Sequence, residues 1–206
     1  RAFILGAPFS LDEGDVLLVS LETPVGDKRR IDIEVGSTVI EVKRDLRRGR
    51  VRVDAVDQLA GYVQTRADQT GLRYVGILTD GVEWRCYHLA GSELSEVSKF
   101  ELTRGASQLE ELTIWLEGVL ATTRGIAPTA SEILTRLGAN SSAHKLDRAT
   151  LALLYEQNRD APSVKLKRAL WSRLLTSALG TQFEDTDELF IEHTLLVNSA
   201  EIIAHA

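Results

Sequence analysis

The sequence predicts an α/β domain, in which a mixed sheet is flanked by helices, followed by an all-α helical domain. In the first half, apolar runs rich in β-branched residues alternate with short glycine-containing turns. A single amphipathic helical pattern interrupts those runs. In the second half, leucine recurs at helical spacing instead. We therefore expect two domains, residues 1–103 and residues 104–206.

The first hairpin is predicted from the turn that joins its strands. After an apolar run at 16–22, the stretches "RIDIEV" and "TVIEVK" are separated by Gly36 and Ser37. A two-residue loop with glycine first is typical of a type II′ turn. The register that follows pairs Ile33 with Ile40 and places Asp32 opposite Glu41.

A helix and a second hairpin are predicted next. Residues 54–66 form one helical pattern, with an apolar face made of Ala55, Val56, Leu59 and Val63. The runs "RYVGILT" and "VEWRCYHL" then flank Asp80 and Gly81, a dipeptide typical of a type I′ turn. The predicted order up to residue 103 is therefore three strands, a helix and two strands.

The second half predicts four or five helices. "ASQLEELTIWLEGVL" spaces its apolar residues at helical intervals. Thr129 with Glu132 forms a capping box for a helix that ends at Gly138. Another helix lies between Ser163 and Gly180, and Asp185 with Glu188 begins the last one. The apolar face of that last helix is expected to pack against further protein.

Composition excludes several classes of protein. With 206 residues, 44% hydrophobic and 26% charged, the chain is typical of a soluble globular protein. A single cysteine, Cys86, excludes an internal disulfide and favours a cytoplasmic location. There is no apolar run long enough to span a membrane. The net charge of -6 argues against a protein that coats nucleic acid by bulk charge.

The first hairpin carries the charged side chains that need an explanation. Directly opposed residues share a face, so Asp32 and Glu41 would lie side by side, with Lys43 on the same face. The apolar residues of the two strands would point the other way, into a core: Ile31, Ile33, Ile40 and Val42. Two such acids repel each other, unless a divalent ion takes oxygen ligands from both.

This arrangement suits phosphodiester hydrolysis, in which a metal polarises the phosphate and acidifies a bound water. A nearby ammonium group can orient that water or offset developing charge. The alternative is an ordinary surface hairpin, in which Lys43 and Arg30 soften the repulsion between the acids.

Basic residues surround the two acids. Between residues 28 and 52 there are nine lysines or arginines against four acids. We predict that four of them contact DNA phosphates: Arg30, Arg44, Arg47 and Arg48. The alternative for the cluster alone is a solvated, arginine-rich loop.

These residues resemble a known family. Asp32, eight intervening residues and then Glu41-Val42-Lys43 at the end of an apolar strand resemble the active-site motif of PD-(D/E)xK nucleases. Ile31 stands where that motif has its often absent proline. Gln58 and Tyr62 resemble the QxxxY element of type I restriction subunits and related nucleases, and share one helical face.

The resemblance implies a restriction-endonuclease-like fold and a role for each residue. Asp32, Glu41 and the backbone carbonyl of Val42 would bind Mg²⁺ or Mn²⁺. Lys43 would position or activate the attacking water, and Gln58 with Tyr62 would support the site. Related nucleases often carry a further acid on an earlier helix, for which Glu13 and Glu22 are the candidates.

Two longer segments extend the resemblance. "GILTDGVEWRCY" resembles a hairpin of large restriction enzymes, and "DELFIEHTLLVNSAEIIAHA" resembles the helical connector to an adenine-N6 methyltransferase in single-chain type IIG restriction-modification proteins. This implies a site-specific endonuclease acting on double-stranded DNA, with methyltransferase and target-recognition domains beyond Ala206. Two alternatives stay open: a non-cleaving DNA-binding or scaffold module, and the nuclease part of an ATP-driven type I-like subunit.

Other reactive residues are assigned lesser roles. The four histidines show no zinc-ligand spacing; His88 is predicted to be a surface residue and His193 a helix residue packed against further protein. Cys86 is predicted to be a small core residue. A second basic group is interpreted as a solvated helix face rather than a DNA contact: Lys165, Lys167 and Arg168.

Overall fold

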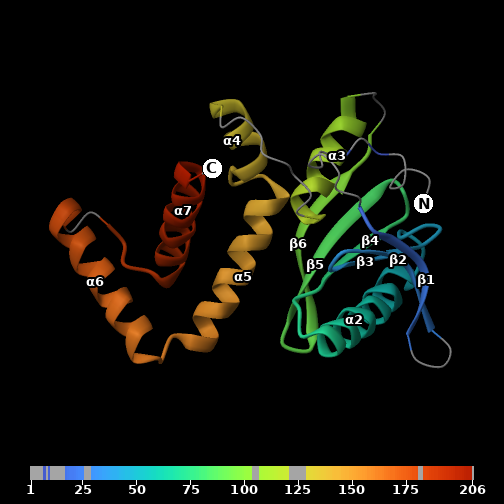
Figure 1. Ribbon diagram of the computed structural model, residues 1–206, viewed down its shortest axis with the longest axis horizontal. Coiled ribbons are helices and arrows are strands. Elements are labelled where there is room, and N and C mark those ends of the chain that lie inside the picture. The colour runs from blue at the N-terminus through green and yellow to red at the C-terminus, as the bar shows by residue number, and fades with distance from the viewer. Residues whose placement is uncertain are drawn as a thin grey trace. The chain divides into compact units, whose positions relative to one another are not determined.

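The computed structural model describes residues 7, 9, 17–25, 29–103, 107–120, 129–180 and 183–205. The chain divides into two compact units, Arg1–Leu146 and Asp147–Ala206, which are described separately below. Figure 1 shows strands and helices in the first unit and helices alone in the second. Within the described residues, six strands and six helices confirm an α/β mixed sheet followed by helices.

The sheet has its six strands in sequence order, and only the pair β3 and β4 is parallel. Its strands are β1 (Val19–Val25), β2 (Arg29–Val35), β3 (Thr38–Val42), β4 (Val75–Thr79), β5 (Glu83–Ala90) and β6 (Glu93–Glu101). Parallel neighbours need a crossover connection, and the helix α2 (Val51–Thr70) supplies it between β3 and β4.

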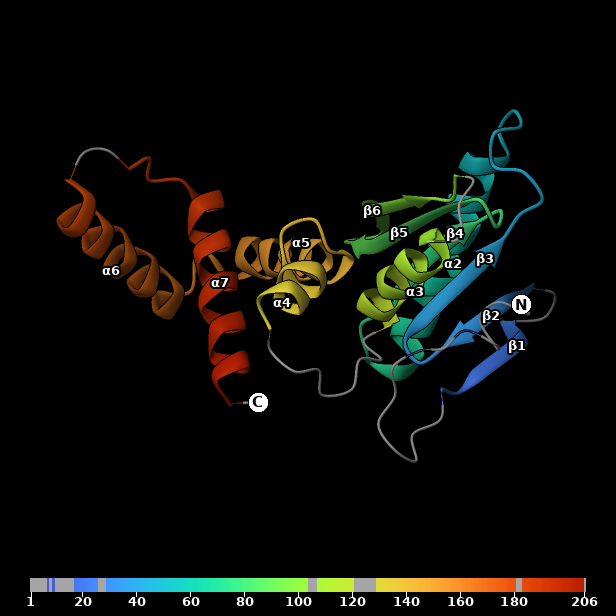
Figure 2. The same cartoon turned by 90° about the horizontal axis from the view of Figure 1, so that it is seen from above.

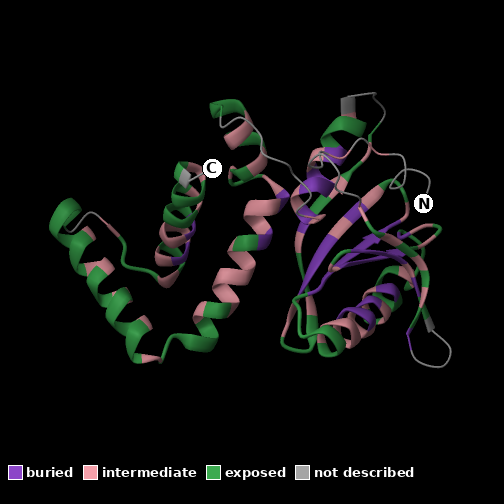
Figure 3. Ribbon diagram, viewed as in Figure 1, coloured by how far each residue is buried: buried purple, intermediate pink, exposed green. Residues whose placement is uncertain are grey.

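Two helices cover the two faces of the sheet (Figure 2). The α2 face buries a core that we call the α2-side core: Val25, Ile31, Val39, Leu46, Ala55, Leu59, Tyr62, Val63, Tyr74, Leu78 and Tyr87. The helix α3 (Ser107–Leu120) contributes to the α3-side core: Ile33, Val35, Ile40, Val75, Ile77, Trp84, Cys86, Leu112, Trp115, Leu116, Val119 and Leu146. Burial is concentrated in the strands and on the faces of α2 and α3 (Figure 3).

The first hairpin has the predicted register. Ile33 pairs with Ile40 and Val35 with Thr38, so Gly36 and Ser37 are the two loop residues. Gly36 has a φ of 52°, as the first loop position of a type II′ turn requires. The helix that follows is longer than the predicted 54–66, and it ends at Gly71, whose φ of 68° only glycine adopts easily.

The second hairpin turns one residue later than predicted. Thr79 pairs with Trp84, so the loop residues are Gly81 and Val82 rather than Asp80 and Gly81. The reason is the side chain of Asp80, whose Oδ1 accepts the backbone N–H groups of Val82 and Glu83 at 3.0 and 2.9 Å. This side-chain turn fixes Asp80 before the loop instead of inside it.

The strand β6 is not among the predicted strands. A tight connection at Gly91, with a φ of 70°, returns the chain from β5. The strand has glutamates and serines between its apolar residues, and a register shift between Cys86 and Tyr87 breaks the pairing pattern. Its weak hydrophobic alternation therefore obscured an edge strand.

The division between the two units also lies later than the predicted boundary at residue 103. Leu112, Trp115 and Leu116 of α3 are at most 7% exposed, because they pack on the sheet in the α3-side core. The helix α3 is therefore part of the sheet unit. Leu109, at 51% exposed, lies off the buried face.

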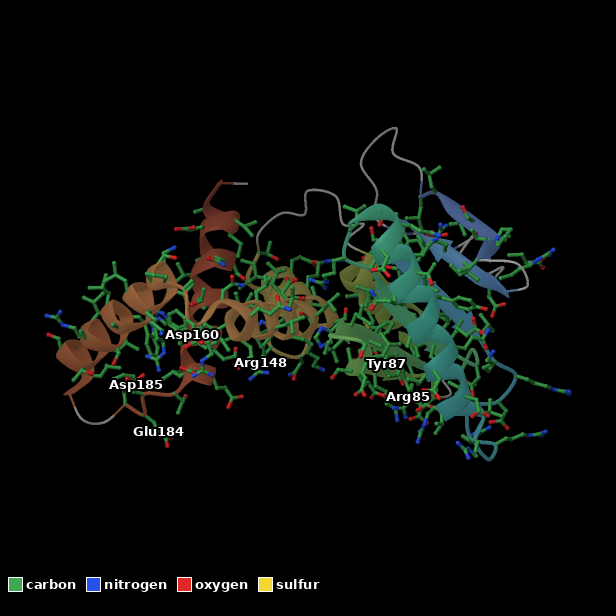
Figure 4. All side chains as sticks on the ribbon, turned by 90° about the horizontal axis from the view of Figure 1, so that it is seen from below. Arg85, Tyr87, Arg148, Asp160, Glu184 and Asp185 are labelled. Carbon is green, nitrogen blue, oxygen red and sulfur yellow. The ribbon has the colours of Figure 1, made fainter. Side chains whose placement is uncertain are left out.

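The remaining helices are α4 (Ala130–Leu137), α5 (Ser142–Asn158), α6 (Pro162–Leu179) and α7 (Asp187–His205). The predicted N-cap of α4 is confirmed, since the Thr129 hydroxyl accepts the N–H of Glu132 at 3.2 Å, while the carboxylate of Glu132 pairs with Arg136 at 2.9 Å. The start of α7 differs slightly. Thr186 accepts the N–H of Leu189 at 3.1 Å, while Asp185 (Figure 4) pairs with Arg168 at 2.5 Å.

Candidate active site

The carboxylate of Asp32 lies against the strand that carries Glu41. The β2–β3 ladder ends at the pair Ile33 and Ile40, one position before these two acids. If the antiparallel ladder continued, the N–H of Val42 would donate to the carbonyl of Ile31. Instead, Asp32 Oδ2 accepts that N–H at 2.8 Å. Both acids therefore lie at the place where β2 stops pairing with β3.

The alternation of side chains along β2 also changes at Asp32. Ile33 lies in the α3-side core as predicted, whereas Ile31 lies in the α2-side core. The prediction that both point to one core is wrong, as is the buried side chain predicted for Val42, which is 42% exposed. In the pairing of β1 with β2, Glu22 lies opposite Asp32 and has a φ of 50°. Both strands are therefore irregular at this pair of residues.

Glu41 is buried and only half of its carboxylate is paired. The residue is 2% exposed, its Oε1 forms an ion pair with Lys43, and its Oε2 has no hydrogen-bond partner among the described residues. Burial raises the pKa of Glu41, the charge of Asp32 raises it further, and the hydrogen bond from Lys43 opposes both effects. The pairing of Asp32 with Glu41 across the ladder stays a prediction, because the observed ladder ends at Ile33 and Ile40.

A chain of hydrogen bonds connects Lys43 to α2. Its Nζ donates to Gln58 Oε1 at 3.0 Å, and Gln58 Nε2 donates to Tyr62 Oη at 2.8 Å. Tyr62 is 1% exposed and lies in the α2-side core, so it fixes the amide of Gln58. The backbone N–H of Lys43 donates to the carbonyl of Thr79 at 2.9 Å. The structure thus brings Glu41, Lys43, Gln58 and Tyr62 together.

The described side chains near Glu41 do not form a complete set of metal ligands. They would suit a magnesium ion that keeps part of its water shell. Within the described ranges, no group of three or more histidine, cysteine, aspartate or glutamate residues could hold a metal. The oxygen donors that the structure places there are the unpaired Oε2 of Glu41 and the carboxylate of Asp32, which accepts the N–H of Val42. Mg²⁺ commonly binds through one or two carboxylates and keeps several waters, so this donor set suits it.

The predicted DNA-contacting arginines are exposed. Arg47 and Arg48 have 80% and 76% of their side chains accessible and pair with Asp45 at 3.3 and 3.2 Å. Arg44 is exposed, and Arg30 pairs with Glu22 at 3.4 Å on the sheet surface. Glu22 is thereby engaged on the surface, and Glu13, the other candidate acid, lies outside the described residues.

Asp80 is a further residue next to the candidate site that was not predicted from the sequence. Its Oδ2 accepts the N–H of Leu46 at 3.1 Å, which ties the segment after β3 to the turn after β4. Because β3 and β4 are parallel, the segments that follow them begin at the same end of the two strands. The signal was present in the sequence as an aspartate directly after a buried strand.

The lesser roles assigned from sequence are only partly correct. Cys86 is a core residue, and burial raises its pKa to about 12. His88 is not a surface residue: it is 8% exposed, because β5 lies inside the sheet, and burial lowers its pKa. His193 contacts α6, accepting a hydrogen bond from Trp171 at 3.1 Å.

The second basic group is engaged with acids of its own unit. Lys165 pairs with Asp160 at 2.9 Å, and Arg168 pairs with Asp185 and stacks on the ring of Trp171 at 4.7 Å. Lys167 is exposed. Lys165 and Lys167 thus lie on an exposed helix face as predicted, whereas the Arg168 side chain is only 17% accessible and is not solvated.

Comparison with known proteins adds no relative: no family model, no curated protein and no solved structure matches this chain. In the part of the chain that the structure describes, none of the helices combines the length and the apolar character needed to cross a membrane.

Proposed function

We propose that the sheet unit is a Mg²⁺-dependent endonuclease that hydrolyses phosphodiester bonds of double-stranded DNA. The observation that carries this proposal is the carboxylate of Glu41, buried beside Asp32 with its Oε2 unpaired. Leaving a buried carboxylate oxygen without a partner is costly, and a divalent cation would satisfy it. A solvated surface hairpin, the ordinary alternative, does not account for a glutamate that is 2% exposed.

Each residue has a distinct part in this proposal. Asp32, Glu41 and the carbonyl of Val42 would hold the metal, which supplies a Lewis acid and lowers the pKa of a bound water. Lys43 would hold the attacking water or offset charge on the phosphate, with its Nζ fixed 3.0 Å from Gln58. Tyr62 restrains Gln58 and thereby limits where the ammonium group can move.

The biological setting proposed here is a bacterial restriction-modification protein. It rests on the resemblance of the Asp32, Glu41 and Lys43 motif and of two longer segments to such enzymes. A type IIG-like arrangement would add a methyltransferase and a target-recognition domain, and a type I-like arrangement an ATP-driven translocase. In either case phosphate contacts carry no sequence information directly, so the target sequence would be read elsewhere.

The test is cleavage of a supercoiled plasmid in the presence of Mg²⁺. We expect Asp32→Ala and Lys43→Ala each to reduce the rate by about 10²- to 10⁴-fold, because each removes a group that acts on the metal or the water. Lys99→Ala is the matched control: Lys99 also lies between two acids, Glu83 and Glu101, but on β6, and its removal should leave cleavage unchanged.

Retained cleavage in both Asp32→Ala and Lys43→Ala would reject the assigned site. A wild-type chain that binds duplex DNA but cleaves none of it with Mg²⁺ or Mn²⁺ would favour the non-cleaving DNA-binding module instead.

A further inference from the structure

The segment between β3 and α2 is an exposed group of arginines next to the candidate active site. We call residues 44–50 the arginine loop; it begins directly after Lys43. Its arginines are Arg44, Arg47, Arg48 and Arg50, and the side chains of the last three are 80%, 76% and 84% accessible. Figure 2 shows this segment extending from the end of β3 before α2 begins.

The arginine loop is nevertheless well anchored. The side chain of Leu46 is 2% exposed in the α2-side core, and its N–H is held by Asp80 at 3.1 Å. Within the loop, Asp45 Oδ1 accepts the N–H of Arg47 at 3.0 Å, and the N–H of Val51 donates to the carbonyl of Arg48 at 3.0 Å. An anchored backbone therefore carries exposed guanidinium groups.

These guanidinium groups are suited to phosphate. Their planar donors match phosphate oxygens, and exposed ion pairs such as those with Asp45 contribute little, so phosphates can replace them. The arginine loop follows Lys43 directly in sequence. Phosphates bound by its arginines would therefore be near the phosphate on which Lys43 is proposed to act.

We propose that Asp80 is a positioning residue that fixes the arginine loop as a contact surface for the backbone phosphates of double-stranded DNA. The identity of the ligand rests on the proposed function; the anchoring of the loop does not. Asp80 touches neither substrate nor metal, and its hydrogen bond to the loop is the one from the N–H of Leu46.

The two oxygens of Asp80 have separate tasks, which makes a selective variant possible. Oδ1 accepts the N–H groups of Val82 and Glu83 in the β4–β5 turn, while Oδ2 accepts the N–H of Leu46. In Asp80→Asn the amide oxygen can keep the turn, and the amide NH₂ then faces the N–H of Leu46, donor against donor. The change should release the loop without undoing the hairpin.

Asp80→Asn also separates positioning from bulk charge. Removing one negative charge makes the chain more basic, so electrostatics alone predicts tighter binding to DNA. Positioning predicts weaker binding. Asp57→Asn is the matched control, because Asp57 is an exposed acid of α2 outside the arginine loop. It should bind as well as the parent or more tightly.

The experiment measures the affinity for a short DNA duplex by fluorescence anisotropy at several salt concentrations, without divalent metal and in a Lys43→Ala background. Arg47→Ala combined with Arg48→Ala should reduce the slope of log K against log salt by about 2, since each phosphate contact contributes about 0.9. Lys167→Ala combined with Arg173→Ala, two exposed basic residues of α6, is the control and should leave the slope unchanged.

Asp80→Asn should weaken binding by about 3- to 10-fold, as expected when contacts lose their preorganisation. Leu46→Ala, which loosens the loop from its apolar anchor without touching the β4–β5 turn, should do the same. Thermal unfolding of each variant confirms that the sheet unit remains folded.

Three results would overturn the inference. An unchanged salt slope in the Arg47→Ala, Arg48→Ala variant would show that the arginine loop does not contact DNA phosphates. Binding of Asp80→Asn and Leu46→Ala at parental affinity or tighter removes the positioning role. Tighter binding of duplex RNA than of duplex DNA removes the assignment to DNA. Because no cleavage is involved, normal binding by a wild-type chain that fails to nick plasmid would reject the proposed function while leaving this inference standing.

Discussion

Two buried glutamates, Glu34 and Glu41, lie on neighbouring strands, and each is linked to α2 by a basic side chain. Glu34, 7% exposed, has both oxygens engaged: Oε2 pairs with Arg66, and Oε1 accepts the hydroxyl of Tyr74 at 3.1 Å. Glu41, 2% exposed, has Oε1 paired with Lys43 and Oε2 unpaired. Two buried residues of the same type thus differ in one respect: Glu34 has both carboxylate oxygens paired, and Glu41 has one unpaired.

The helix supplies different chemistry at the two places. Gln58 and Arg66 are eight residues apart, about 12 Å along the helix axis. Arg66 reaches its glutamate directly, as a full positive charge with several donors. Gln58 is neutral and accepts from Lys43 instead, so it fixes the lysine without satisfying the acid. The unpaired oxygen therefore lies where α2 presents the neutral side chain of Gln58 rather than an arginine.

The largest expected effect separates the two glutamates by activity. We expect Glu41→Gln to lower the rate of plasmid cleavage by about 10²- to 10⁴-fold, because a neutral amide is a poor ligand for Mg²⁺. Glu34→Gln, the matched control, should cleave within about 3-fold of the wild type, as expected for a residue away from the reacting atoms. Equal losses of cleavage in the two variants, measured on folded protein, would show that Glu41 has no role in cleavage beyond that of Glu34.

Stability should show the opposite order. Glu34→Ala leaves Arg66 and Tyr74 without their shared acceptor, and we expect it to reduce the free energy of unfolding by about 2–3 kcal/mol. This is below the cost for a fully buried pair, because the Arg66 side chain is 22% accessible and can turn to water. Urea unfolding measures the effect. A loss below about 0.5 kcal/mol, the size expected of a surface change, would show that the network is not structural.

The pH dependence of stability should identify the ionisation of Glu41. Burial raises the pKa of Glu41 above its ordinary value of 4.5, so the folded state favours the protonated form. The stability that this gives is present below about pH 4.5 and is lost as pH rises through the folded pKa. Glu41→Gln cannot ionise, so it should gain stability relative to the wild type over that rise.

Urea unfolding of both proteins in EDTA, from acid to neutral pH, measures this difference. A constant difference across the range would contradict the raised pKa, and so would a relative gain by the wild type as pH rises.

A smaller effect is expected from Tyr62→Phe. The change removes the acceptor of the Gln58 Nε2 bond but keeps the ring in the α2-side core. We expect a stability loss of about 1 kcal/mol and a reduction of cleavage by about 3- to 10-fold, since Gln58 no longer holds Lys43 as firmly. Tyr74→Phe is the matched control and should affect stability alone, because Tyr74 contacts Glu34.

Much of the sheet could be predicted because its turns depend on local chemistry. Gly36 and Ser37 allow one turn geometry, and the register follows from it. The second hairpin was misplaced because a side chain, that of Asp80, competes with the backbone preference of the Asp-Gly pair. The edge strand β6 and the association of α3 with the sheet depend on long-range packing, which periodicity alone does not report.

For the candidate site, sequence predicted which residues meet but not how. The turn at Gly36 and Ser37 brings Asp32 against the strand that carries Glu41, and helical spacing places Gln58 next to Tyr62. The irregularity of β2 at Asp32 could not be predicted, since it involves the positive φ of Glu22 on the neighbouring strand. The anchoring of Leu46 by Asp80 joins positions 34 residues apart, so no local pattern reveals it.

The most direct test of the central claim is Mn²⁺ binding at neutral pH, measured by calorimetry on the wild type, Glu41→Gln, Asp32→Asn and Glu34→Gln. We predict one bound ion in the wild type and in Glu34→Gln, and at least about 10-fold weaker binding in the other two, as the loss of a charged oxygen ligand implies. Binding that is unchanged in Glu41→Gln and Asp32→Asn, or lost equally in Glu34→Gln, would contradict the assignment of Glu41 as the open metal ligand.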